Sequence, residues 1–378
     1  MTTDTLSSYH MPHDAFILTS SRHIDQFNAA KVLPAYSQYQ TGQRATTQPW
    51  EVEFHLTGNC SLRCNGCSYA TRRTGMELTV PGITTVLNEF ESDSVKAVFF
   101  SGGGDPFMWK HWDGLLRAKA ESTWDFPIGV SSNLVAFKHR IRKPASVAEI
   151  DFYQVHILGY DEESCRNASG VNCYRRMRDN LNYLFENVTD RNTVTMKFML
   201  NEHNCLQITD YLDFVSDYPV DSIVIKVQQN FLENKPASGL TADHYAMVSD
   251  RIANHKICMR LGITLNNFND RLISNNHIPK DCHIAKSGMY CLIRENGDVF
   301  PCIASTNDPG NALGNIGRVS IKEILANVAK RNQNSNNMID GKCPTLACRH
   351  YRLAKIIEEY RGLSRRFTLH ELPVPTLI

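Results

Sequence analysis

Three of the twelve cysteines in this chain of 378 residues crowd into eight positions, at Cys60, Cys64 and Cys67. At this cysteine content, chance gives such a spacing in roughly 1% of sequences. Three thiolates on one short loop can bind three corners of a four-iron, four-sulfur cube and leave one iron free. A zinc site normally presents paired ligands and a fourth Cys or His. The triplet therefore predicts an iron–sulfur site, and structural zinc or unrelated thiols are the alternatives.

A glycine-rich turn is the second group of residues that could bind a ligand. Gly102, Gly103, Gly104 and Asp105 follow an apolar run at 95–100 that is typical of a buried strand. Glycines allow the backbone to approach a ligand closely, and Asp105 adds a carboxylate. Such a turn is often no more than a turn, but its place one strand after the cysteine loop indicates a shared site.

Alternating strand and helix signals from residue 50 to about 265 supply the frame for both loops. This alternation predicts a parallel sheet, and α/β barrels carry their chemistry on loops at the carboxyl ends of the strands. The predicted strands are 50–56, 95–101, 126–131, 151–157, 193–199 and 221–227. The predicted helices are 79–90, 108–121, 171–186, 204–215 and 242–258.

The cysteine triplet and the glycine-rich turn resemble two motifs of the radical S-adenosylmethionine (SAM) superfamily. Cys60, Cys64 and Cys67 match its C-x-x-x-C-x-x-C signature, and residues 101–106 are similar to its Gly-Gly-Glu-Pro motif. The resemblance implies an α/β fold with a partial (β/α)6 TIM-like barrel. It also implies that the three thiols hold a four-iron, four-sulfur cluster that binds SAM, and that the glycine-rich turn contacts SAM.

Two positions depart from the family pattern. Asp105 stands where the family usually has Glu, which is one methylene longer. Gly66 stands where an aromatic residue often precedes the last cysteine. Part of the adenine contact is therefore missing or is supplied elsewhere, for instance by Tyr69. Neither departure changes the expected family.

The ends of later strands offer further contacts for SAM or substrate. Ser132 and Asn133 resemble the turn after the family's third strand, near the methionine part of SAM. His156 replaces a serine of the family's fourth strand, and a hydrogen-bonded barrel histidine is the alternative. Lys197 and Lys226 belong to the more polar sets of their strands, which should face the barrel interior. They are candidate ligand contacts or paired structural lysines.

The C-terminal third carries a second group of cysteines around a predicted β-hairpin at Asn296 and Gly297. This segment resembles the SPASM and twitch auxiliary-cluster domains appended to many radical SAM enzymes. The resemblance implies a second four-iron, four-sulfur cluster, and a structural zinc site on the same thiols is the alternative. The four candidate ligands are Cys282, Cys302, Cys343 and Cys348.

Cys291 lies on the predicted hairpin between two of these candidate ligands. It is an alternative ligand, or a catalytic residue that donates a hydrogen atom to a substrate radical, as a cysteine does in radical SAM epimerases. The remaining cysteines are expected to be buried and inert, because free cysteine commonly packs as a small apolar residue. They are Cys165, Cys173, Cys205 and Cys258.

These motifs divide the chain into four parts. Residues 1–48 form an N-terminal extension, and residues 49–270 form the partial barrel. Residues 271–355 form a small auxiliary-cluster domain with a β-hairpin and a helix, and residues 356–378 form a C-terminal tail.

Composition limits the partners of the chain. The 40 Lys and Arg residues balance 39 Asp and Glu residues, so the net charge of +1 lacks the basic excess of a nucleic-acid surface. No apolar run approaches the ~20 residues of a membrane span. The N-terminus shows no basic and apolar regions of a signal peptide. We therefore expect a cytoplasmic protein with neither a nucleic-acid nor a membrane partner.

The resemblance implies an enzyme that reductively cleaves SAM to a 5′-deoxyadenosyl radical, which takes a hydrogen atom from a substrate carbon. A donor such as flavodoxin or ferredoxin would supply the electron. The outcome is oxidation, cross-linking or epimerisation of a small natural product, sugar-like or aminocyclitol-like, or of a short peptide. The alternatives are a maturase of a ribosomally made peptide and a non-catalytic iron–sulfur or zinc regulator on the same fold.

Overall fold

The computed structural model describes the barrel and the first part of the C-terminal region. The described residues are 15–19, 49–70, 73–90, 95, 97–230, 235–236, 239–261, 285, 288, 290–327 and 330. The candidate ligands Cys282, Cys343 and Cys348 lie outside these ranges, as does the predicted C-terminal tail.

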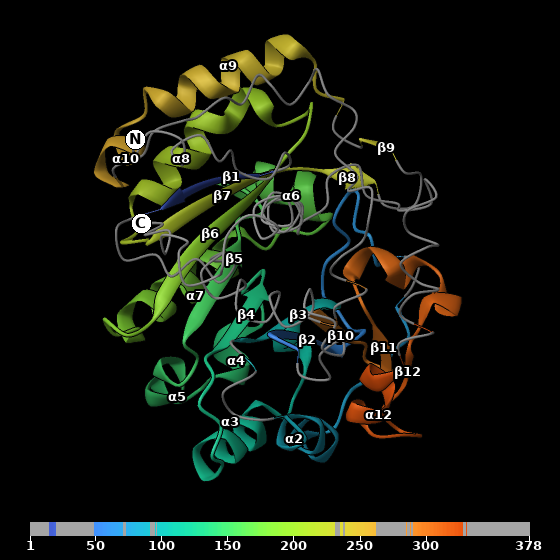
Figure 1. Ribbon diagram of the computed structural model, residues 1–378. Helices are drawn as coiled ribbons and strands as arrows, with labels where there is room; N and C mark the ends of the chain where they lie inside the picture. Colours follow the sequence, from blue (N-terminus) through green and yellow to red (C-terminus); the bar gives the residue numbers. More distant parts are fainter. Residues whose placement is uncertain are drawn as a thin grey trace, which may run out of the picture.

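Within the described residues, ten strands form one sheet in the order β1-β7-β6-β5-β4-β3-β2-β10-β11-β12. The six central strands run parallel, and each pairs with its neighbour in the sequence. They are β2 (Glu51–Thr57), β3 (Ala97–Gly103), β4 (Ile128–Ser132), β5 (Phe152–His156), β6 (Thr193–Leu200) and β7 (Ser222–Val227). This arrangement, visible in Figure 1, confirms the predicted partial (β/α)6 barrel.

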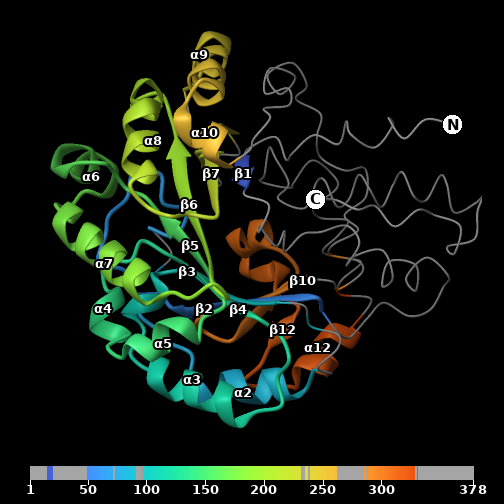
Figure 2. The same ribbon diagram turned by 90° about the vertical axis from the view of Figure 1, so that its left-hand side faces the viewer.

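Helices form a layer along the outer side of these strands, as the view in Figure 2 shows. They are α2 (Val80–Asn88), α3 (Trp112–Glu121), α4 (Phe137–Arg140), α5 (Pro144–Ala148), α6 (Glu162–Ser169), α7 (Tyr174–Asn187), α8 (Ile208–Ser216), α9 (Ala242–Ala253) and α10 (Lys256–Leu261). The Thr79 side chain caps α2 by accepting a hydrogen bond from the Gly82 amide. Helix α3 begins four residues later than predicted, because Pro106–Met108 forms a separate 3-10 helix, η2.

Strand β2 shows how the sheet separates an apolar layer from a polar barrel interior. Val52, Phe54 and Leu56 are fully buried in the core between sheet and helices. Glu53 and His55 alternate with them and so point to the opposite face. Each large apolar side chain buried in this way contributes roughly 1.5–3 kcal/mol to stability.

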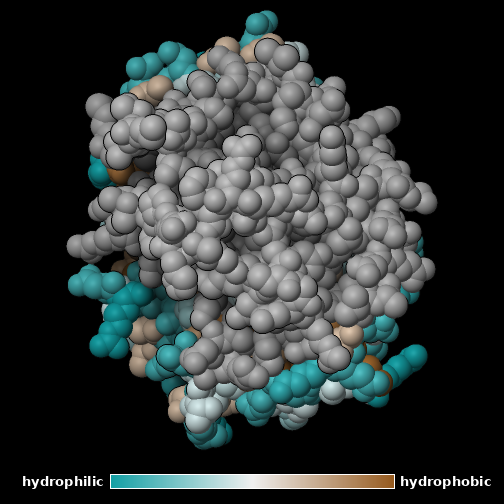
Figure 3. Space-filling model, viewed as in Figure 1, coloured by the Kyte–Doolittle hydropathy of each residue, from teal (hydrophilic) through white to brown (hydrophobic). Residues whose placement is uncertain are grey.

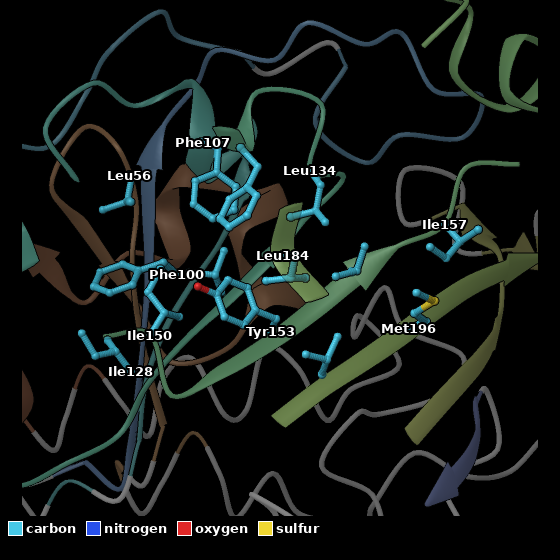
Figure 4. Close-up of a cluster of buried hydrophobic side chains, with 14 of the residues drawn as sticks. Leu56, Phe100, Phe107, Ile128, Leu134, Ile150, Tyr153, Ile157, Leu184 and Met196 are labelled. Atoms are coloured by element: carbon cyan, nitrogen blue, oxygen red, sulfur yellow. The ribbon is translucent and has the colours of Figure 1, made fainter. Parts of the chain in front are cut away.

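Aromatic rings fill the layer between the first strands and the first helices. Figure 4 shows Leu56, Phe100 and Phe107 gathered in this core. The rings of Phe54 and Phe100 lie 5.7 Å apart, and Phe100 meets Trp112 edge-on at 5.5 Å. The core therefore holds the carboxyl ends of β2 and β3 rigidly below the loops that carry the predicted motifs.

The C-terminal region extends the barrel sheet at the free edge of β2. It contains β10 (Tyr290–Ile293), β11 (Asp298–Phe300), β12 (Gly314–Asn315) and α12 (Ile321–Ala326). Strand β10 pairs in parallel with β2 and antiparallel with β11, which confirms the predicted hairpin. At the opposite edge, β1 (Ala15–Thr19) pairs antiparallel with β7, although the sequence predicted no strand in this extension.

In the described ranges, no helix is long and apolar enough to cross a membrane. Where described residues reach the surface around the rim of the view in Figure 3, hydrophilic groups predominate. Among the described residues, the large apolar side chains that are more than one-third exposed are Met76, Leu206 and Val319, which lie far apart in the sequence.

Candidate functional site

The cysteine loop leaves the carboxyl end of β2 and is held from two sides. The Arg73 guanidinium donates hydrogen bonds to the carbonyl oxygens of Cys60 (3.3 Å) and Leu62 (3.0 Å). On the other side, the Arg63 amide donates to the carbonyl of Ser169 at 2.8 Å. The sequence analysis did not single out Arg73, because its role depends on a fold of the loop that no motif specifies.

Gly66 is required by the shape of this loop. Its φ is +70°, a backbone angle that residues other than glycine rarely adopt. A Cβ atom there would lie 1.6 Å from Nε2 of Gln228, which donates to the Asn65 carbonyl at 2.9 Å. The absence of an aromatic residue at this position therefore has a local explanation. The side chain of Gln228, the residue after β7, occupies the space that a side chain at position 66 would need.

The three thiols lie within electrostatic reach of one another. Burial, followed by the charge of Asp105, raises the pKa of the Cys60 thiol. Burial and then the neighbouring Cys60 and Cys67 raise the pKa of Cys64 to about 12. Bound iron reverses this effect, because a cation stabilises coordinating thiolates. The donor set therefore fits an iron–sulfur cluster.

The glycine-rich turn packs directly against the cysteine loop. The Gly104 amide donates to the Thr57 carbonyl at 2.7 Å, and the Asp105 amide donates to the Asn59 carbonyl at 2.8 Å. A Cβ atom on Gly104 would lie 1.9 Å from the Asn59 oxygen, and Gly103 has a φ of +73°. These glycines bring the two loops together, and the amides of Gly104 and Asp105 bond to the protein itself. This differs from the expected approach of backbone amides to a ligand.

The Asp105 carboxylate joins the ends of β3 and β4. Oδ1 accepts a hydrogen bond from the Phe107 amide (2.9 Å), and Oδ2 accepts from Ser132 Oγ (2.8 Å) and the Asn133 amide (3.0 Å). Burial raises the pKa of Asp105, and these hydrogen bonds oppose the rise. Three of the four lone-pair positions on the carboxylate are therefore in use within the described residues.

Asn133 connects this carboxylate with the cysteine loop. Its Nδ2 atom lies 4.0 Å from Cys60 Sγ as a donor, and its Oδ1 atom accepts from the Val135 amide at 2.9 Å. Leu134, next to it, has a φ of +58°, which is unusual for a residue with a side chain. The structure therefore brings the predicted residues Cys60, Asp105, Ser132 and Asn133 to one place.

Tyr69 reaches the start of the glycine-rich turn. Its ring meets the His55 ring edge-on, with centroids 5.2 Å apart. A Cβ atom on Gly102 would lie 3.3 Å from the Tyr69 ring and 2.9 Å from His55 Nε2. Gly102 therefore admits these two rings, and His55 is a neighbour of the turn that the sequence analysis missed.

His156 ends β5 on the barrel-interior face. Its Nε2 atom lies 3.4 Å from Ser131 Oγ, and Lys197 Nζ donates to the nearby Gln154 Oε1 at 3.4 Å. Burial, followed by the charges of Lys197 and Lys226, holds the pKa of His156 well below its ordinary range. Burial and the two lysine charges thus disfavour the charged form of this interior imidazole.

Comparison with family models decides what this arrangement is. Residues 54–228 match the radical SAM superfamily, and residues 282–349 match SPASM, an iron-sulfur cluster-binding domain. The chain contains a radical SAM domain and a SPASM domain. A radical SAM protein binds SAM at a four-iron, four-sulfur cluster, and the SPASM domain adds auxiliary iron–sulfur binding. No curated protein sequence matches the chain.

Solved radical SAM structures share the fold at low identity. SuiB of Streptococcus suis, bound to its precursor peptide SuiA, is 15% identical, with a TM-score of 0.61 over 80% of this chain and 70% of SuiB. Native anSMEcpe with bound AdoMet and Cp18Cys peptide is 14% identical, with a TM-score of 0.57 over 81% of this chain and 88% of anSMEcpe. At these identities, the similarity establishes the fold.

The SPASM region is tied to the SAM-binding region by a hydrogen bond from Thr74 to Glu295, which also forms a buried ion pair with Arg294. Glu295 Oε1 accepts from Arg294 Nη2 (2.7 Å) and from Thr74 Oγ1 (3.0 Å). Thr74 follows the cysteine loop, and a Cβ atom on Gly103 would lie 3.2 Å from Glu295 Oε2. The hairpin turn therefore touches both loops of the SAM site, a contact that no sequence pattern indicated.

Of the four candidate auxiliary ligands, Cys302 is described. It is buried, and its sulfur accepts a hydrogen bond from the Ala304 amide at 3.4 Å. Such a bond favours the thiolate form that binds iron. Cys302 lies two residues after the end of β11, so the confirmed hairpin positions it.

Cys291 occupies a different environment. It is fully buried on the face of β10 that packs in the apolar core, together with Ile293 and Val299. Burial raises the pKa of its thiol far above the ordinary value. A hydrogen-atom donor must reach a substrate in the barrel interior, so this placement does not support the catalytic role considered for Cys291.

Proposed function

We propose that this radical SAM protein is an enzyme that abstracts a hydrogen atom from a substrate carbon. When bound at the cysteine loop, a four-iron, four-sulfur cluster would supply the electron that cleaves SAM to methionine and a 5′-deoxyadenosyl radical. The observation that carries the proposal is the convergence of the cysteine loop, Asp105 and Asn133 at the carboxyl ends of β2, β3 and β4. Loops at this end of an α/β barrel carry its chemistry.

Two residues position the cysteine loop that would hold the cluster. Arg73 fixes two carbonyls of the cysteine loop, and Asn133 lies against the Cys60 sulfur. The last lone-pair position of Asp105 is suited to an N–H group of SAM. The packed aromatic core below these loops holds the strand ends that carry them.

The substrate that we propose is a peptide. SuiB was solved with its precursor peptide, and anSMEcpe was solved with a peptide and AdoMet. The auxiliary iron–sulfur domain favours a net oxidation, such as dehydrogenation or cross-linking, because a second cluster can accept the electron left on the substrate. The core position of Cys291 gives no support to epimerisation.

A transfer experiment tests the proposal even while the substrate is unidentified. The protein is reconstituted with iron and sulfide without oxygen, then incubated with SAM, a strong reductant and extracts of cells grown on deuterated medium. Each extract is divided into a peptide fraction and a small-metabolite fraction. Deuterium in the 5′-deoxyadenosine formed with the peptide fraction supports a peptide substrate. Transfer from the metabolite fraction alone refutes the substrate class, and no 5′-deoxyadenosine in any sample refutes the enzyme.

A further inference from the structure

A buried polar cluster lies on the interior face of the barrel where β2, β3 and β10 meet. Glu53 and His55 are 1% and 0% exposed. Glu53 Oε1 accepts a hydrogen bond from Ser101 Oγ, and Oε2 accepts from the Tyr290 hydroxyl. His55 Nε2 lies 3.4 Å from Glu53 Oε1. A buried carboxylate is tolerated only when it is paired in this way, and here three donors surround it.

The pairing decides which nitrogen of His55 is left over. A carboxylate can only accept hydrogen bonds, so a ring that pairs with it through Nε2 does so as an Nε2–H donor. In the neutral tautomer of that kind, Nδ1 presents a lone pair. Nδ1 is buried, and no hydrogen-bond partner for it exists in the part of the chain that the structure describes. Leaving such an atom unpaired costs roughly 1–3 kcal/mol, so native proteins rarely do so without a ligand or a water molecule.

The position of the ring indicates which ligand it meets. The His55 ring lies edge-on to Tyr69, which stands two residues beyond Cys67. It also fills the space beside Gly102, at the start of the glycine-rich turn. The imidazole is therefore placed between the two segments that carry the SAM site, on the side that faces the barrel interior.

We propose that His55 Nδ1 accepts a hydrogen bond from an N–H group of bound SAM, either its ammonium group or its adenine amine. The inference rests on the proposed function, because it needs SAM in the barrel. It adds His55 to the binding residues and makes Glu53 a positioning residue that sets the tautomer of the ring. Neither residue belongs to the cysteine triplet or to the glycine-rich turn.

Two substitutions of His55 separate the two ring nitrogens. In His55→Asn the side-chain amide lies near the former Nδ1, whereas in His55→Gln it lies near the former Nε2 and still faces Glu53. Reconstituted full-length variants are compared by equilibrium dialysis with labelled SAM, and the spectrum of the reduced cluster is recorded with and without SAM. We expect His55→Gln to weaken SAM binding about tenfold, as one lost hydrogen bond does, and His55→Asn to stay within about threefold.

The tautomer is read by nitrogen NMR of histidine-labelled protein with oxidised clusters. The Nε2–H form is expected in the wild type, and Glu53→Gln is expected to change the balance. His203→Gln is the matched control, since the His203 side chain is 85% exposed.

Unchanged SAM binding in His55→Gln overturns the inference and assigns Nδ1 to a water molecule. Equal losses in both His55 variants overturn it too, because they show packing alone. A wild-type protein that binds no SAM refutes the proposed function instead.

Discussion

The Asp105 side chain shows how much of the site depends on one carboxylate. Asp105→Ala removes the acceptor for the Phe107 amide, the Asn133 amide and Ser132 Oγ at once. All three donors are at the buried contact between the ends of β3 and β4. The free energy lost by leaving them without an acceptor exceeds the free energy gained by no longer burying a carboxylate. We expect the free energy of unfolding to fall by about 3 kcal/mol, measured by urea titration.

The control for this substitution is Asp125→Ala. Asp125 is exposed in the segment between α3 and β4, and surface substitutions usually change stability by less than about 0.5 kcal/mol. If Asp105→Ala is no less stable than Asp125→Ala, the carboxylate does not hold β3 and β4 together as described.

His156 gives the molecule a pH dependence of a defined sign. Its pKa is held well below the ordinary value of 6.5 by burial and by Lys197 and Lys226. Below about pH 6.5 the unfolded chain binds a proton that the folded chain does not, so stability is full above that pH and falls below it. The slope is at most about 1.4 kcal/mol per pH unit. We expect urea unfolding at pH 7.5 and 5.5 to show a larger loss for the wild type than for His156→Gln. Equal losses would contradict a lowered pKa, and His203→Gln should behave as the wild type.

At the scale of elements, the turn of the β10–β11 hairpin requires a glycine at position 297. Gly297 has a φ of +85°, and a Cβ atom there would lie 3.2 Å from Asn315 Oδ1. Gly297→Ala is expected to lower the free energy of unfolding by about 1–2 kcal/mol, because side chains disfavour the left-handed region. Gly114→Ala is the comparison, since Gly114 lies inside α3, where alanine is the better residue. Equal effects of the two substitutions on urea unfolding would show that the turn is not strained by a side chain.

The barrel strands could be predicted because their patterns are local. The alternation from Thr193 to Leu200 identifies β6 by itself, and the apolar run ending at Phe100 identifies β3. Strand β1 could not be predicted, since it exists as a strand only by pairing with β7, far away in the sequence. Helix α6 was missed because its eight residues are mostly polar. Its one signal was the capping box of Asp161 and Ser164.

The site divides in the same way. Cys60, Cys64 and Cys67 and the glycine-rich turn are contiguous motifs, and spacing alone identified them. Arg73 and Glu295 could not be found by spacing, because they act through hydrogen bonds that form only in the folded chain. The bond between Thr74 and Glu295 spans 221 residues. His55 is an intermediate case, since its alternation with Phe54 and Leu56 predicts an inward ring but not its neighbours.

At the scale of the whole molecule, the SAM-binding barrel and the SPASM hairpin form one continuous sheet. Strand β10 adds to β2 in parallel, with Leu292 opposite Glu53. Tyr290 from β10 donates to Glu53, and Glu295 from the hairpin turn accepts from Thr74. The two regions are therefore joined by main-chain hydrogen bonds and buried side chains, although each region carries its own thiols.

Because the two regions carry separate sets of thiols, substitutions in each set should have different effects on iron content and on SAM cleavage. The reconstituted wild type should hold about eight irons per chain, and either Cys64→Ala or Cys302→Ala should lower this to about four. Only Cys64→Ala should abolish 5′-deoxyadenosine formation without substrate, because Cys302 lies in the auxiliary region. Cys205→Ala is the control, because Cys205 is a buried thiol beside α8. It should change neither the iron content nor the formation of 5′-deoxyadenosine. Iron and zinc are counted by elemental analysis. Zinc in place of the second four irons, or loss of SAM cleavage in Cys302→Ala, would contradict two independent iron–sulfur sites on one sheet.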